Sequence, residues 1–162
     1  MQLDKKIDMW GQPIPKGGNL LSRMFVYSKR NPELFGRPMY EDFLRTGDGA
    51  FLPPAVEPKL NDKKLTTNQY KRLVEYIGTE RKKLVEPYVN NQSVLEGYNV
   101  TYNDLNDEGK KFALSYMYQL GRENGLNKFY SDFPDLKPKE PEINYSEKVK
   151  QDLFKILSKY RK

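Results

Sequence analysis

Proline and glycine divide this chain into short segments, so its apolar residues form small groups rather than long runs. The 162 residues include 11 prolines and 11 glycines. Proline lacks the backbone N–H that a helix interior needs, and glycine loses the most backbone freedom on folding. Between these breaks the apolar residues recur at helical spacing. We predict a mostly α fold: a small irregular domain of about five helices, unequal in length and joined by extended proline-rich arms.

The positions of these breaks predict four parts. An N-terminal arm with one short helix covers residues 1–36, and a helical body covers 37–126. A proline-rich linker over 127–144, interpreted as an exposed arm, then leads to a C-terminal amphipathic helix over 145–162.

The clearest helical signal lies in the body. Thr66 and Gln69 have the spacing of a capping box, in which each side chain satisfies an open backbone donor at a helix start. Gly78 stands where a glycine C-cap is favourable. Between them, an apolar stripe at helical spacing consists of Tyr70, Leu73, Val74 and Ile77. This pattern predicts a helix over about 67–77.

Three more helical segments are predicted in the body. One starts at Thr79, its regularity limited by Pro87, and turns inward Leu84, Val85, Tyr88 and Val89. Another begins near Pro38 and stops before Gly47, and the longest covers 106–124 and ends at Gly125.

Residues 47–63 form a linker that favours extended, polyproline-like chain. Its apolar side chains need cover from this protein or from a neighbour, and they are Phe51, Leu52, Ala55, Val56 and Leu60.

Five pieces in order carry a family resemblance. They are DMWGQP (8–13), NLLSR (19–23), YEDFL (40–44), FLPP (51–54) and KLTTNQYKRLVEYIG (64–78). In order and spacing they resemble the C-terminal, non-catalytic region of large bacteriophage internal-virion or "polyvalent" proteins, which are ejected with the genome, and of some tape-measure proteins. The resemblance covers roughly residues 4–125.

The resemblance implies a non-enzymatic structural component of a phage particle, associated with the internal core, the portal or the tail. Its partners would be other virion proteins, and a homo-oligomer in a symmetric assembly is compatible with it. The expected location is the virion, with the host cytoplasm during assembly.

Under this interpretation the arms bind partners by burying apolar surface. The expected anchors are Trp10, Phe51, Leu52, Pro53 and Pro54, and the expected docking stripe of the last helix is Leu153, Leu157 and Tyr160. Trp10 fits either a binding hot spot or a plug that fastens the N-terminal arm to the body, and we favour the plug. The last helix has three open alternatives: return to its own core, pairing with another copy, or insertion into a partner's groove.

The composition argues against an enzyme. The chain has no histidine and no cysteine, which removes the commonest general base and the commonest nitrogen and sulfur metal ligands. Asp104, Asp107 and Glu108 lack a calcium-loop pattern, and helix capping with dipole complementarity explains them. We predict no catalytic residue, no cofactor and no metal site.

The positive charge of the chain suggests an alternative function, that of a small basic nucleic-acid-binding protein. The formal net charge is +6, and the cations that could contact phosphates nonspecifically are Lys63, Lys64, Lys71, Arg72, Arg81, Lys82 and Lys83. Solvated helix faces are the simpler explanation of the same residues. No apolar run approaches the roughly 18 residues of a membrane helix, and the first ten residues lack a signal-peptide core, so we expect no membrane segment.

Overall fold

The structure is a computed structural model that describes residues 37–90, 100–138 and 159–160. These residues are mostly helical, which confirms the predicted class. The helices are α2 (Arg37–Thr46), α3 (Thr67–Val89) and α4 (Asp107–Asp132). Short 3-10 turns are η1 (Gly49–Phe51), η2 (Tyr102–Asp104) and η3 (Pro134–Leu136), and the strands are β1 (Lys59–Leu60) and β2 (Lys63–Lys64).

The predicted number of about five helices is not confirmed, because three α-helices lie in the described part. The short helix expected within 1–36 and most of the helix expected over 145–162 lie outside the described residues. Trp10, Leu153 and Leu157 lie outside them as well.

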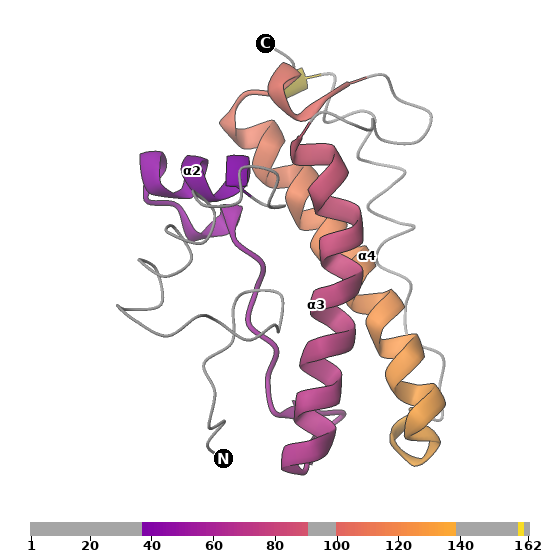
Figure 1. The fold of residues 1–162 in the computed structure, drawn as a ribbon. Helices are drawn as coiled ribbons and strands as arrows, with labels where there is room; N and C mark the ends of the chain where they lie inside the picture. Colours follow the sequence, from indigo (N-terminus) through magenta and orange to yellow (C-terminus); the bar gives the residue numbers. More distant parts are fainter. Residues whose placement is uncertain (1–36, 91–99, 139–158, 161–162) are drawn as a thin grey trace.

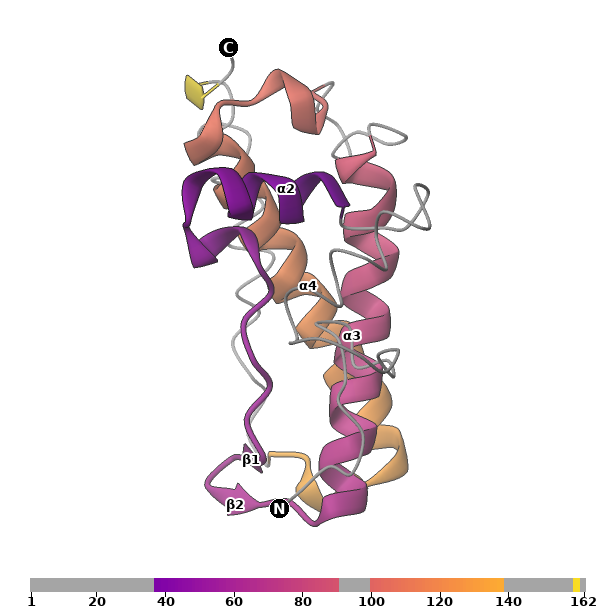
Figure 2. The ribbon, with the colours of Figure 1, turned by 60° about the vertical axis from the view of Figure 1, so that its left-hand side comes forward.

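Two long helices form the framework. α3 and α4 lie side by side and run in opposite directions (Figure 1). α2 lies across the end of the pair where α4 begins, and the β1–β2 hairpin lies at the other end, beside the start of α3 (Figure 2). The chain between η1 and β1 runs along the pair from one end to the other.

α3 is one helix where two were predicted. The Thr66–Gln69 capping box is present as expected. Gly78 does not end the helix, which continues through it and through Pro87 to Val89. An internal glycine costs about 1 kcal/mol relative to alanine, and burial of Ile77, Arg81 and Val85 on either side outweighs that cost.

α4 also continues past its predicted stop. Asn106 caps its start by accepting from the Gly109 N–H, and the helix passes through Gly125 to Asp132. Leu126 and Phe129 are buried. The interpretation of residues 127–144 as an exposed arm is therefore wrong for 127–132, because this stretch is helical and Phe129 and Tyr130 complete the core beside the start of α3.

α2 agrees with its prediction at both ends. Pro38 lies in the first turn, and Gly47 adopts the left-handed backbone (φ 70°) while its N–H donates to the Phe43 carbonyl. Met39 is fully buried on the inner face of α2, whereas Leu44 is 49% exposed.

The 47–63 segment crosses the body and buries part of its apolar content there. Asp48 caps η1, Phe51 is fully buried, and Leu60 is 5% exposed. Two hydrophobic clusters result. The first joins α2, η1, η2 and the adjoining halves of α3 and α4, and the second joins the hairpin to the start of α3 and the end of α4.

Of the helices that the structure describes, none combines the length and the apolar character needed to cross a membrane.

Candidate functional site

Of the predicted arm anchors, those at 51–54 lie along the body of the same chain. Phe51 is fully buried, and its carbonyl accepts from the Tyr118 hydroxyl at 2.6 Å. Leu52 and Pro53 are half-buried, whereas Pro54 is exposed. Phe51 therefore fastens the segment to its own core, because its side chain has no exposed area to offer a partner.

Tyr160 is half-buried and lies at the start of α4. Its carbonyl accepts from the Asn106 N–H at 3.0 Å, and a Cβ built on Gly109 would stand 2.8 Å from the Tyr160 Cβ. Among the three alternatives for the C-terminal segment, this contact favours return to its own body.

The seven cations proposed to bind nucleic acid fall into three groups: buried or half-buried side chains, ion-paired side chains, and exposed side chains. Arg81 is buried, at 4% exposure, and Lys82 is half-buried. Arg72 lies 3.6 Å from Asp132, and Lys83 lies 3.2 Å from Glu80. The remaining three are exposed and have no ion-pair partner within the described ranges: Lys63, Lys64 and Lys71.

Arg81 holds three elements together instead of facing a ligand. Its Nε donates to the Tyr118 carbonyl of α4 at 3.0 Å, and its Nη1 donates to the Pro54 carbonyl at 2.9 Å. Burial, with a smaller contribution from Arg122, lowers the pKa of Arg81 to about 10. The guanidinium therefore carries its charge inside the protein at neutral pH, compensated by carbonyl dipoles.

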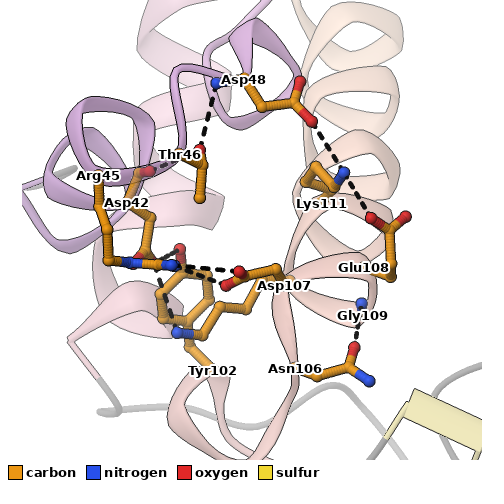
Figure 3. Close-up of polar contacts among 11 residues, drawn as sticks. Asp42, Arg45, Thr46, Asp48, Tyr102, Asn106, Asp107, Glu108, Gly109 and Lys111 are labelled. Carbon is orange, nitrogen blue, oxygen red and sulfur yellow. Dashed lines mark hydrogen bonds and ion pairs between the residues drawn. The ribbon is translucent and has the colours of Figure 1, made fainter.

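The densest polar cluster joins α2 to the start of α4 (Figure 3). Asp42 is its centre. The Tyr102 hydroxyl donates to its Oδ2 at 2.6 Å, Lys110 Nζ lies 3.4 Å from the same oxygen, and Arg45 Nη2 lies 3.1 Å from its Oδ1. Lys110 also lies over the Tyr102 ring, 4.9 Å from the centroid. Burial and then the Asp42 hydrogen bond raise the pKa of Tyr102 above its ordinary value.

Three further ion pairs border this cluster. Arg45 binds Asp107 through both nitrogens, at 2.6 and 3.2 Å, and this hydrogen bonding lowers the pKa of the Asp107 carboxyl. Lys111 lies 2.8 Å from Asp48 and 2.7 Å from Glu108. Asp107 and Glu108 also occupy the first turn of α4, which agrees with the dipole interpretation.

A second set of polar contacts joins the middle and the far end of the helix pair. The Glu80 carboxylate, 10% exposed, contacts both Lys83 and Lys128. Burial raises the pKa of Glu80, but the hydrogen bonds from the two lysines outweigh it and the net pKa is lowered. The Tyr76 hydroxyl donates to Asp132.

Most of these hydrogen bonds and ion pairs connect one secondary-structure element to another. Each carboxylate named above receives a donor from another element, except Glu108, whose partner Lys111 lies in the same helix. In the part of the chain that the structure describes, no group of three or more metal-ligating side chains gathers.

Sequence reasoning missed Asp42 and Lys110, because they lie 68 positions apart and no local pattern links them. A signal for the close helix contact was present. Gly121 and Gly125 are four residues apart, so they lie on one helix face, and each faces the α3 backbone.

Comparison of the chain with protein-family models, with curated proteins and with solved structures gave no match.

Proposed function

We propose that this protein is a non-enzymatic structural component of a bacteriophage particle that acts through protein–protein contacts. The resemblance of its ordered pieces to the non-catalytic region of internal-virion and tape-measure-like proteins carries the phage assignment. Placement in the internal core, portal or tail, and ejection with the genome, follow from the same resemblance.

One structural observation supports this proposal. Three of the five pieces, at residues 40–44, 51–54 and 64–78, belong to helices or segments that pack into one body. Phe43 packs against the cluster that contains Phe51, and Leu73 and Ile77 are buried in the second cluster. These three pieces thus belong to one folded unit, which is what a module requires.

The polar contacts between the helices support the non-enzymatic part of the proposal. Among the described residues, the buried charged side chains are Glu80, Arg81 and Lys110. Each of them has a partner in the same chain. Their chemistry is used to hold the helices together.

Cross-linking mass spectrometry on intact particles from the source tests the proposal. Lysines of 59–83 and 137–162 serve as reporters, because both groups carry primary amines. We expect reproducible links from both groups to a portal, tail or internal protein. Absence of the chain from purified particles would refute the assignment.

The alternative function, a small basic nucleic-acid-binding protein, is supported by a specific observation. Lys63, Lys64 and Lys71 are exposed, with no carboxylate at ion-pair distance within the described ranges. Arg81 leaves the candidate set because it is buried. A steep fall of DNA affinity with salt, together with absence from particles, would favour this function over the first.

A further inference from the structure

The β1–β2 hairpin is fixed to the end of the helix pair. Leu60 is 5% exposed and lies in the cluster that includes Leu126 and Phe129. The Asn61 side-chain amide donates to the Leu136 carbonyl at 3.2 Å. Asn61 and Asp62 have positive φ angles of 51° and 64°, as a tight two-residue hairpin turn requires. The side chains on this hairpin are therefore presented from a defined backbone.

The register of the hairpin places two lysines opposite each other. Lys59 pairs with Lys64, and Leu60 pairs with Lys63. Directly opposed residues of antiparallel strands lie on the same face, and like charges in such a pair are destabilising. Lys59 and Lys64 are both exposed, whereas Leu60 is buried. The hairpin thus presents a like-charge pair on its outer face, at a cost to its own stability.

Nearby acidic groups do not neutralise this pair. Residues 59–71 contain four lysines and one aspartate, a local charge of 4 − 1 = +3. Asp62 lies 3.9 Å from Lys59, but its side chain is fully exposed, and ion pairs of this kind contribute little. Lys63 and Lys64 have no ion-pair partner in the described part of the chain.

At the start of α3, which follows β2, two backbone N–H groups are already engaged within the chain. The Gln69 N–H already donates to the Thr66 hydroxyl, and the Thr66 N–H donates to the Gln69 side chain. An anion at the hairpin would therefore be held by lysine ammonium groups, and these are mobile point charges without the fixed fork of arginine.

We propose that Lys59 and Lys64, the opposed pair on the outer face of the hairpin, form a binding surface for the phosphate backbone of double-stranded DNA, without base recognition. The lysine chemistry accounts for the lack of sequence preference, because phosphate contacts carry no base information. This surface does not rest on the virion proposal, since a protein packed beside a genome and a free DNA-binding protein would use it in the same way.

The test compares two double variants of the full chain that lose the same charge. The hairpin variant is Lys59→Gln with Lys64→Gln. The control is Lys111→Gln with Lys128→Gln, two cations of α4 outside the candidate set. Binding of a fluorescein-labelled 20-base-pair duplex is followed by anisotropy between 50 and 200 mM NaCl. Thermal melting is recorded for both variants.

We expect the hairpin variant to bind roughly tenfold more weakly at 100 mM NaCl, and its slope of log affinity against log salt to fall by about 2, which is about 0.9 per lost phosphate contact. Its melting temperature should be unchanged or higher, because a like-charge pair is removed. The control should keep its affinity within about twofold. Equal weakening of the two variants, wild-type affinity in the hairpin variant, or no wild-type binding at 50 mM NaCl would each overturn the proposal.

Discussion

Gly125 of α4 lies directly against the backbone of Ile77 in α3. A Cβ at position 125 would stand 2.6 Å from the Ile77 Cα and 2.7 Å from its nitrogen. Gly121, one turn earlier, has the same relation to Arg81, with 2.7 Å to its Cα. The two helices therefore approach backbone to backbone at the centre of the molecule, where the two hydrophobic clusters meet.

Replacing Gly125 with alanine should destabilise the protein. The atoms that must move are backbone, so we expect a loss near the upper end of the roughly 1–3 kcal/mol typical of overpacking. This exceeds the gain of about 1 kcal/mol that alanine has over glycine in a helix. Urea unfolding followed by circular dichroism measures the difference.

Gly49→Ala is the matched control, because a Cβ there meets nothing within 4 Å. Its free energy of unfolding should stay within about 0.5 kcal/mol of the wild type. A Gly125→Ala protein as stable as this control would show that the helices can separate without cost.

Tyr88→Phe should leave the stability unchanged or raise it by up to about 1 kcal/mol. The Tyr88 hydroxyl is buried and, in the described structure, has no hydrogen-bond partner, so its removal relieves a desolvation cost. Tyr118→Phe is the contrasting variant, since it leaves the buried Phe51 carbonyl without its 2.6 Å donor. We expect that variant to lose roughly 1–3 kcal/mol, and equal effects in a chemical denaturation series would contradict the assignment.

Asp42→Asn should lower the free energy of unfolding by roughly 1–3 kcal/mol, because it weakens the contact between α2 and α4. The change leaves the Lys110 ammonium, on a side chain 10% exposed, without its carboxylate. Asp62→Asn, at a fully exposed side chain, is the control and should have no measurable effect. In a Lys110→Met background the same Asp42→Asn change should cost less, and additive losses would show that the pair is not coupled.

Stability should fall as the pH rises above about 10. Burial raises the pKa values of Tyr88, Tyr102 and Tyr118 above the ordinary 10.0. In the unfolded chain these hydroxyls ionise near pH 10, whereas in the folded protein they remain protonated, so the unfolded state is favoured as protons are lost. Arg81 acts in the opposite direction, because its folded pKa is lowered to about 10, but one group opposes three.

Absorbance at 295 nm, which reports tyrosinate, checks this pH dependence when it is combined with far-ultraviolet circular dichroism. The chain has 12 tyrosines. We expect the exposed ones to ionise first, with the fold intact, and Tyr88, Tyr102 and Tyr118 to ionise together with unfolding. Ionisation of all tyrosines near pH 10 without loss of helicity would contradict the burial argument.

Local sequence determined the starts of the helices and one of the stops. The Thr66–Gln69 box, the Asn106 cap and the left-handed Gly47 involve groups within a few residues of each other. A capping side chain or a left-handed backbone is favourable whatever surrounds it. The mostly helical fold class was also predictable from local sequence, because it follows from the helical spacing of apolar residues.

Only the tertiary structure decided which glycines end a helix and which lie within one. Gly78 and Gly125 have the sequence position of a C-cap, yet both lie inside a helix, because burial against the partner helix outweighs the local cost. The same holds for Phe51, because only the folding of its segment across the body brings it against Tyr118. The Asp42–Lys110 pair spans 68 positions, and only the packing of α2 on α4 brings the two charges together.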